Sequence, residues 1–542
     1  MHAVQGEREA AGPGTAHGGL VSRRAFLAMG IGTLGAAAAA AAGADDVAAA
    51  AALRRGPPWA ALAASLAGAL VRPDDAAYPV AKQLYNERFD GIVPAAIAYC
   101  AGPADVQRCV DFARRHGVQV AARSGGHSYG GYSLCPGLVV DVSRMAGVRV
   151  AGDRRTATVG AGARMIDLYA ALGQTGLLLP GGSCPTIGVA GLALGGGVSV
   201  FGRRFGLTCD RMRSVDLVTA DGALRTCDRS RNEDLFWASR GGGGGNFGIA
   251  TSFTFEVAPI PPLTLFTLVW PWAAAGDVLS AWLQWLPGTP DELWANCQLL
   301  SAGAAGGTTP LTVKVTGVFC GPAGGAAGVL EPLRAAVGST PVYEFAGPEQ
   351  YLPAMLVEAG CQGMSVAACH LPTQNPAGTL SRSAYAAKSA YVVHPLPEAG
   401  VAAVTDAVVA LDRDVPDVGG GISFDAYGGA INRVAPGATA FVHRDAIAGA
   451  QWSCSWSAGA PAPLVSSAQA WLSATARGVA PFTAGAYQNY IDPTLADWAR
   501  AYYGTNLPRL VGIKRKVDPE DFFHFAQSIP LRLPAGGPAT PR

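Results

Sequence analysis

Three glycine-rich segments within about 130 residues constrain the fold more than any other feature of the sequence. They read RSGGHSYGG (123–131), PGGSCPTIGVAGLALGGG (180–197) and DLFWASRGGGGGNFGIAT (234–251). Glycine allows the backbone to approach a ligand closely, and turns at strand ends expose N–H groups that can hold phosphate oxygens. Each segment alone is also compatible with a structural turn, and none matches GxGxxG or a P-loop. Together they indicate a large flat ligand of about dinucleotide size.

Strand and helix patterns alternate around these segments. Apolar residues at helical spacing predict helices over 103–117 and from 165 onward, and strands are predicted at 118–123, 138–143 and 155–162. After the proline-rich boundary at 259–263, a strand pattern at 311–319 and a helix pattern at 401–415 predict a second domain. Aromatic residues are dense in the last fifty residues, which indicates a closing segment packed over a site.

The N-terminal residues read as a targeting signal. Arg23 and Arg24 precede a mildly apolar, alanine-rich stretch, and Ala42-Gly43-Ala44 provides a small-residue cleavage site. The pattern predicts a twin-arginine export signal over 1–44, followed over 45–77 by a linker that could also hold a loosely attached helix. An uncleaved membrane anchor is the alternative, but the stretch is short and poor in Leu and Ile. No later segment has the apolar run of a spanning helix, so no stable membrane span is expected.

Charge and cysteine content exclude several classes of function. The formal net charge is +1 and Lys and Arg form no basic stripe, which gives no reason to expect a nucleic-acid partner. The 11 cysteines form no CxxC pair and no Cys/His cluster, so no metal site is predicted. Most are expected to be buried thiols, with a disulfide or two.

The motifs resemble those of the berberine bridge enzyme-like family of FAD-linked oxidases, over about 78–531. The resemblance is carried by the three glycine-rich segments together with YQNYIDP (487–493) and YYGTNLPRL (502–510). It implies an α+β fold: a PCMH-type FAD-binding domain of two α/β subdomains over 78–258, and a substrate domain over 259–480 with an antiparallel sheet flanked by helices. A C-terminal berberine-bridge-like segment over 481–535 would close on the FAD domain.

The same resemblance implies how FAD is held. His127 stands where family members bond the flavin 8α-methyl carbon, and Cys184 stands where bicovalent members bond ring carbon C6. Val189 matches the position thought to govern oxygen access, where valine favours an oxidase. The expected cofactor-binding residues are Arg123, Ser124, Gly125, Gly126, His127, Ser128, Gly182, Cys184, Gly188, Val189, Gly191, Gly248, Ile249 and Asn489.

Catalytic residues are expected from three further motifs. Tyr490 matches the tyrosine over the flavin, Gln451 a glutamine near the substrate, and Tyr129 follows the histidine motif by two residues. Some relatives place a carboxylate base on the strand SFDAYGGAINRV (423–434), where Asp425 and Tyr427 are both candidates. Arg433 stands roughly where alkaloid-processing relatives carry glutamate, which argues against alkaloid bridge formation.

The resemblance therefore implies an exported FAD-dependent oxidase, extracellular or in the periplasm or cell wall. It would move hydride from an alcohol carbon of a sugar, oligosaccharide or hydroxylated secondary metabolite to FAD, and oxygen would be reduced to hydrogen peroxide. Its expected partners are a small-molecule substrate, molecular oxygen and the twin-arginine export machinery. Two alternatives remain at this point: a flavin dehydrogenase with another acceptor, and a non-catalytic flavin- or sugar-binding protein.

Overall fold

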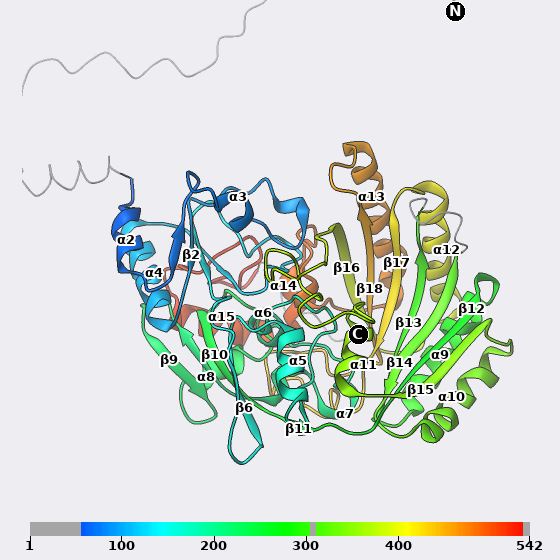
Figure 1. The fold of residues 1–542 in the computed structure, drawn as a ribbon. Coiled ribbons are helices and arrows are strands. Elements are labelled where there is room, and N and C mark those ends of the chain that lie inside the picture. Colours follow the sequence, from blue (N-terminus) through cyan, green and yellow to red (C-terminus); the bar gives the residue numbers. More distant parts are fainter. Residues whose placement is uncertain (1–55, 304–310, 535–542) are drawn as a thin grey trace, which may run out of the picture. The chain divides into compact units, whose positions relative to one another are not determined.

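A mixed four-stranded sheet opens the fold (Figure 1). The computed structural model describes residues 56–303 and 311–534. The strand order is β1 (Ala69–Val71), β2 (Ala96–Tyr99), β4 (Leu138–Asp141) and β3 (Val120–Arg123), with β2, β4 and β3 parallel. Helix α4 (Pro103–His116) connects β2 to β3, as the apolar spacing predicts; Gly117 ends it with a φ of 61°. The sheet ends at the first glycine-rich segment.

Part of the segment predicted as a linker forms a helix and a strand. The signal predicted over 1–44 and the first residues of the linker predicted over 45–77 lie outside the described residues. The remainder of that linker contains helix α2 (Trp59–Ser65) and strand β1, which pairs with β2 through Leu70 and Ala98. The compact unit begins at Trp59, because this pairing and the packing of α2 on α4 include the segment in the fold.

An antiparallel five-stranded sheet completes the part of the fold that is expected to bind FAD, which is called the FAD-binding part below. Its order is β5 (Val148–Val150), β6 (Thr156–Gly160), β10 (Ile249–Glu256), β8 (Met212–Val218) and β9 (Leu224–Asp228). The accompanying elements are α3 (Tyr78–Ala81), α5 (Met165–Gly173), α6 (Val189–Leu194), α7 (Gly202–Phe205), α8 (Glu233–Ala238) and the short pair β7 (Leu177–Leu178) and β11 (Ala258–Pro259). The two sheets form the two subdomains expected from the sequence.

A seven-stranded antiparallel sheet forms the other half, on the right in Figure 1. Its order is β15 (Tyr343–Glu349), β12 (Leu263–Pro271), β14 (Thr312–Phe319), β13 (Leu293–Ser301), β17 (Gly419–Ala426), β18 (Ala448–Trp456) and β16 (Ala384–Val392). The helices packed with it are α9 (Ala275–Trp285), α10 (Ala323–Val337), α11 (Tyr351–Glu358), α12 (Glu398–Asp414) and α13 (Ala462–Val479). The expected α+β fold is confirmed.

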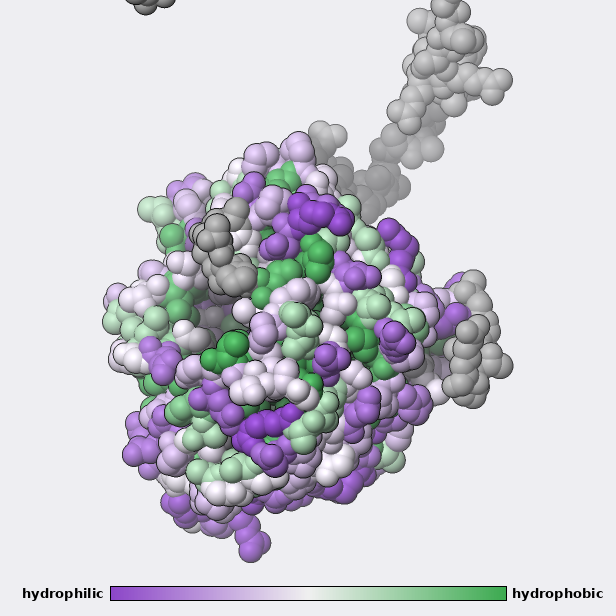
Figure 2. Space-filling model, turned by 90° about the vertical axis from the view of Figure 1, so that its right-hand side faces the viewer, coloured by the Kyte–Doolittle hydropathy of each residue, from purple (hydrophilic) through white to green (hydrophobic). Residues whose placement is uncertain are grey.

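Strand alternation gives this sheet two different faces. On β13, Leu293, Ala295 and Cys297 are fully buried in the core that includes the helices, whereas Trp294 and Asn296 point the other way and line a cavity. Edge strand β15 leaves Tyr343 and Phe345 more than 40% exposed. Figure 2 shows the right-hand side of Figure 1 as a mixture of hydrophilic and hydrophobic residues.

The C-terminal segment packs on the FAD-binding part through helices α14 (Trp498–Tyr503) and α15 (Leu507–Val517). Lys514 is completely buried, and its ammonium donates to the carbonyls of Asn246 and Phe523 and to Asp518. The amide of Ile529 donates to Oδ1 of Asn246 at 2.8 Å. These bonds join the last fifty residues to the third glycine-rich segment.

Within the described ranges, no helix is both long and apolar enough to cross a membrane. The same residues contain no group of three or more His, Cys, Asp or Glu side chains that could hold a metal ion.

Candidate active site

A cavity of about 490 Å³ lies between the FAD-binding sheets, the polar face of the seven-stranded sheet and the C-terminal segment. It brings together nearly all the residues predicted from the sequence. The predicted residues that line it are Arg123, Ser124, Gly125, Gly126, His127, Ser128, Tyr129, Gly182, Cys184, Gly188, Gly191, Gly248, Ile249, Asp425, Gln451, Asn489 and Tyr490. Val189 and Tyr427 are the two that do not.

His127 is held by two contacts. Its Nε2 lies 2.8 Å from Oγ1 of Thr186, and its ring stacks on Tyr85 with centroids 4.2 Å apart and planes 18° apart. Burial, with a smaller effect from the charge of Arg164, lowers the pKa of His127 to about 3. The imidazole is therefore neutral at physiological pH, and a neutral ring nitrogen is a nucleophile.

Cys184 differs from every other described thiol. Of the nine free cysteines, the other eight are buried, and Cys184 alone is partly exposed. Cys184 lines the cavity, as does the buried Cys135. Burial raises the pKa of the thiol to about 11, although hydrogen bonds from Thr186 and Ile187 act in the opposite direction. The sulfur is accessible but protonated, so bond formation there requires removal of a proton.

The glycine positions fit a flat cofactor. A Cβ at Gly191 would meet no atom within 4 Å, so open space lies beside the backbone there. A Cβ at Gly125 would lie 2.1 Å from the amide nitrogen of Gly188, so the first two glycine-rich segments meet backbone to backbone. Such a cradle, with two nucleophiles facing the same cavity, suits the ring of a flavin dinucleotide.

Arg123 is engaged within the protein. Its Nε donates to Asp141 at 2.5 Å and its Nη1 donates to the carbonyl of Ala81 at 2.7 Å. Both side chains of the Arg123–Asp141 pair are almost fully buried. Because the guanidinium is paired, Arg123 holds the ends of β3 and β4 together and presents backbone to the cavity.

Polar side chains line the cavity on the face of the seven-stranded sheet. Trp294, Asn296 and Gln298 alternate along β13, and Thr316 on β14 and Asp425 on β17 flank Asn296 in register. Nε1 of Trp294 and Oδ1 of Asn296 are buried and have no hydrogen-bond partner among the described residues. An unpaired buried donor and acceptor are costly, so this wall requires a polar ligand.

Two carboxyl groups share this wall. Asn296 donates to Asp425, and burial outweighs that bond and raises the pKa of Asp425 to about 6. Glu358, at the end of α11, also lines the cavity. Burial first, and then the negative charge of Asp425, raise the pKa of Glu358 to about 7, against the opposing effect of Lys314.

Three further predicted residues meet beside Asp425. Nε2 of Gln451 donates to the hydroxyl of Tyr129 at 3.0 Å, and the rings of Tyr129 and Tyr490 stack with centroids 5.2 Å apart. Burial raises the pKa of Tyr490 well above its usual value, and Asp425 adds to the effect. Tyr490 is thus a neutral phenol that can donate a hydrogen bond, and Asp425 is the better proton acceptor.

Two of the predicted positions face elsewhere. Val189 begins α6 and is completely buried in the core, whereas Ile187, two residues earlier, lines the cavity. Tyr427 follows the end of β17 and packs in a buried aromatic cluster with Tyr391, their rings 5.4 Å apart. Neither side chain lines the cavity: Val189 lies in the main hydrophobic core, and Tyr427 lies in the aromatic cluster.

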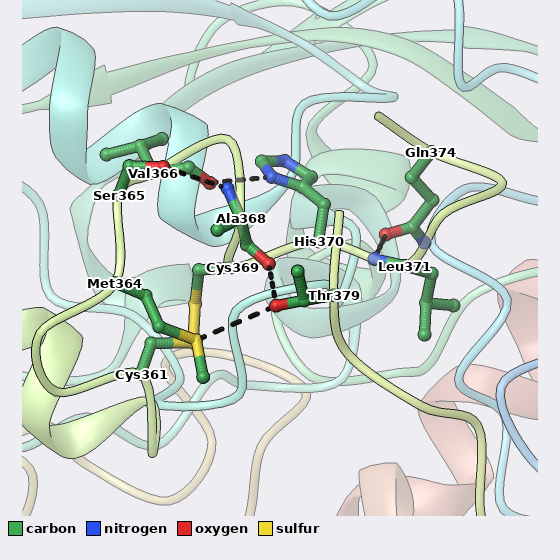
Figure 3. Close-up of a disulfide and its surroundings, with 10 residues drawn as sticks. All are labelled: Cys361, Met364, Ser365, Val366, Ala368, Cys369, His370, Leu371, Gln374 and Thr379. Carbon is green, nitrogen blue, oxygen red and sulfur yellow. Dashed lines mark hydrogen bonds between the residues drawn. A yellow bond between two sulfur atoms is a disulfide. The ribbon is translucent and has the colours of Figure 1, made fainter. Parts of the chain in front are cut away.

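A disulfide lies close to Glu358 in the chain. Cys361 and Cys369 are bonded in the segment that follows α11 (Figure 3). The adjacent His370 is buried, and its Nδ1 contacts the carbonyl of Val366 at 2.8 Å. His370 also contacts Asp167 through Nε2 at 3.2 Å, so this segment is tied to α5 of the FAD-binding part.

Sequence patterns did not identify several residues that line the cavity or support it. These are Tyr85, Thr186, Ile187, Trp294, Asn296 and Glu358. The period-two alternation of polar and apolar residues in ANCQL (295–299) is the one signal that could have indicated Asn296, and it does not extend to the apolar Trp294.

The chain is similar to known flavoproteins over most of its length. Residues 94–228 match the family described as FAD binding domain, and residues 486–530 match the family described as Berberine and berberine like. The uncharacterized FAD-linked oxidoreductase YgaK of Bacillus subtilis is 33% identical over 473 residues, which cover 86% of this chain and 97% of that protein.

Solved structures agree with these matches. BBE-like 1 of Physcomitrella patens superposes with a TM-score of 0.79 at 31% identity, covering 88% of this chain and 99% of that one. Two variants of the protein Phl p 4 superpose with a TM-score of 0.74 at 28% identity, covering 85% of this chain and 96% of theirs. One is a glucose dehydrogenase, and the other, with an additional isoleucine-to-valine exchange, is a glucose oxidase.

Proposed function

Because the chain belongs to the berberine bridge enzyme-like family of FAD-linked oxidoreductases, we propose that it oxidises an alcohol carbon of a sugar or another polyhydroxylated compound. FAD would be bound through both His127 and Cys184, and oxygen would be the electron acceptor. The observation that carries the proposal is a single cavity that contains both nucleophiles and a wall of amide, hydroxyl and carboxyl groups.

The two proposed anchors have different chemical states. His127 is neutral, its Nε2 is engaged by Thr186, and its Nδ1 has no hydrogen-bond partner among the described residues. Cys184 is the accessible thiol among nine free cysteines. When bound there, FAD supplies the hydride acceptor; the protein orients the substrate and accepts its proton.

Asp425 is the proposed base. A pKa of about 6 leaves most of this carboxyl ionised at neutral pH and places it close to the pH at which general bases are most effective. The hydrogen bond from Asn296 fixes the carboxylate, which leaves its other oxygen for the substrate hydroxyl. Tyr490 and the Gln451–Tyr129 pair would hold the substrate oxygen by hydrogen bonds.

The substrate class follows from the unpaired atoms of the sheet face. A hydroxyl group both donates and accepts, so it can accept from Nε1 of Trp294 and donate to Oδ1 of Asn296. Gln298, Thr316 and Glu358 extend the same polar wall. A compound with several hydroxyl groups satisfies this wall, whereas an apolar one would leave its polar atoms unpaired. The activity of Phl p 4 variants on glucose supports the same class.

A dehydrogenase is the second candidate, favoured by one observation. The side chain that faces the cavity near Cys184 is Ile187, and Val189 does not reach it. In Phl p 4 an isoleucine-to-valine exchange distinguishes the glucose dehydrogenase from the glucose oxidase. One hydrogen peroxide per substrate oxidised under air is expected of an oxidase, and a peroxide yield near zero with turnover on an artificial acceptor identifies a dehydrogenase.

Export by the twin-arginine pathway, to the extracellular space, periplasm or cell wall, is part of the proposal. Arg23 and Arg24 and the small-residue site ending at Ala44 support it. The Cys361–Cys369 disulfide supports it independently, because disulfides persist mainly in oxidising compartments. A covalently bound cofactor is also retained after export.

Acid precipitation tests the cofactor proposal. Purified protein is precipitated with acid, and the redissolved pellet is compared with His127→Ala, Cys184→Ala and the double variant by absorption spectroscopy. Flavin should remain in the pellet of the wild type and both single variants, and should be released only when both anchors are removed. A colourless wild-type pellet would reject covalent attachment.

A further inference from the structure

Thr186 and Tyr85 lie against His127 from two directions. The hydroxyl of Thr186 contacts Nε2 at the edge of the His127 ring, and the ring of Tyr85 stacks on the face of the same imidazole. A hydrogen bond at the edge fixes rotation of the ring, and a stacked aromatic fixes its plane. We propose that these two residues form a clamp that presents Nδ1 of His127 to the flavin and that Thr186 couples this anchor to Cys184. The inference rests on the proposed covalent attachment.

The position of Thr186 makes it suitable for both anchors. It is two residues beyond Cys184 in the second glycine-rich segment and is completely buried. Its hydroxyl reaches 59 residues back along the chain to His127. Its side chain also acts to lower the pKa of Cys184, against the larger opposing effect of burial. Thr186 therefore lies beside both proposed nucleophiles.

The surrounding backbone leaves this contact little freedom. The first two glycine-rich segments meet so closely that a Cβ on Gly125 would lie 2.9 Å from the carbonyl oxygen of Thr186. Gly188 is equally confined, because its Cβ would lie 1.9 Å from Oγ of Ser124. The segments cannot slide past each other, so Thr186 and His127 stay in register.

The direction of the hydrogen bonds at Thr186 follows from the donors and acceptors of its hydroxyl group. A threonine hydroxyl has one proton and two lone pairs. Donating that proton toward Cys184 leaves its lone pairs to accept from Nε2–H of His127, and this arrangement places the free lone pair of the imidazole on Nδ1. Thr186 thus selects the tautomer as well as the orientation.

Attachment at His127 breaks one C–H bond of the flavin 8α-methyl group and forms a C–Nδ1 bond. The imidazole, once bonded at Nδ1, releases its Nε2 proton to solvent. The two electrons reach molecular oxygen through FAD, and with the two released protons they give hydrogen peroxide. Attachment at Cys184 balances in the same way: C6–H and S–H bonds break, a C–S bond forms, and a second oxygen molecule takes two electrons and two protons.

Matched substitutions test the clamp without any substrate. Thr186→Val keeps the shape and removes the hydroxyl, whereas Thr186→Ser keeps the hydroxyl; Tyr85→Leu removes the stack, whereas Tyr85→Phe keeps it. Each protein is precipitated with acid, the released flavin is measured, and peptide masses identify which anchor carries flavin. We expect Thr186→Val and Tyr85→Leu to lower the flavin fraction attached at His127 on the order of tenfold, the effect of one lost hydrogen bond or stack. Thr186→Ser and Tyr85→Phe should match the wild type.

The outcomes separate the inference from the proposed function. If the wild type releases all its flavin, covalent attachment is rejected and the clamp with it. If the wild type retains flavin and Thr186→Val retains it equally at both anchors, the clamp alone is rejected. If Thr186→Val does not fold, as judged by circular dichroism, the Tyr85 pair decides: equal attachment in Tyr85→Leu and Tyr85→Phe rejects the clamp.

Discussion

Asn296 donates a hydrogen bond from Nδ2 to Oδ1 of Asp425 at 2.5 Å, across neighbouring strands of the seven-stranded sheet. The two residues are 129 positions apart in sequence, and both line the cavity. Burial raises the pKa of the carboxyl and Asn296 lowers it, so the balance that sets Asp425 near 6 depends on this pair.

Asp425→Asn should reduce the rate of flavin reduction by about 10²–10⁴-fold, because general-base catalysis contributes on that order. The amide keeps the size of the side chain but cannot accept the proton as a carboxylate does. The measurement is anaerobic flavin reduction followed by stopped-flow absorption. Tyr427→Phe is the control, since Tyr427 lies outside the cavity; equal losses in both variants would contradict the assignment of the base.

The pH dependence of kcat/KM should follow Asp425. The ionised form is the active one, so kcat/KM should rise with pH through about 6 and then level off. Asn296→Leu removes a hydrogen bond that favours the carboxylate of Asp425. The substitution should therefore raise the pKa of Asp425 and move the rise in kcat/KM to higher pH. If the rise stays at the same pH in Asn296→Leu, a group other than Asp425 controls it.

Glu358 should make folding stability fall as the pH rises. Its pKa is raised from the usual 4.5 to about 7, so the folded protein holds this proton more tightly than the unfolded chain. The contribution of the protonated Glu358 to the free energy of unfolding is fully present below pH 4.5, and it is lost as the pH rises through about 7. Glu358→Gln should therefore gain stability relative to the wild type over this range, by about 1–3 kcal/mol. Thermal unfolding from pH 4.5 to 8 measures it, and a constant difference between the two proteins would refute it.

Ile187→Val should speed reoxidation of the reduced flavin by oxygen severalfold, because it removes one methyl group from the cavity wall near Cys184. The measurement is reoxidation in air-saturated buffer after anaerobic reduction. Val189→Ala removes volume from the buried core instead, so it should lower the melting temperature and leave the oxygen rate unchanged. The reverse result would restore Val189 as the residue that controls oxygen access.

Replacing both Cys361 and Cys369 by alanine should destabilise the protein by about 2–4 kcal/mol, the usual effect of a disulfide that closes a short loop. The measurement is denaturant unfolding of the variant and of the wild type with and without reductant. Because nine free thiols are also present, the alanine variant with reductant is the control: reductant should have no effect on it.

Local patterns predicted much of the fold. The helical spacing and the flanking Pro103 and Gly117 correspond to α4, and alternation or short apolar runs correspond to β3, β4 and β14. These elements are determined by neighbouring residues. The histidine and cysteine motifs likewise lie in the cavity, because the glycine pattern around them requires close backbone approach.

The remaining site residues depend on contacts that no local pattern contains. Asn296 meets Asp425 only through the register of β13 on β17, and Glu358 reaches the cavity at the end of a helix. Val189 and Ile187 are two residues apart, but Val189 is the first residue of α6 and is buried in the core, whereas Ile187 precedes the helix and lines the cavity. Tyr427, two residues after Asp425, lies outside the cavity because strand β17 ends at Ala426.

The C-terminal segment supplies part of the cavity wall, through Asn489, Tyr490, Phe523 and Phe525. These four residues follow the first two glycine-rich segments by about 300 residues or more in the chain, so the cavity is enclosed only when distant parts of the sequence have packed together. A chain shortened before residue 489 would therefore leave one side of the cavity open to solvent.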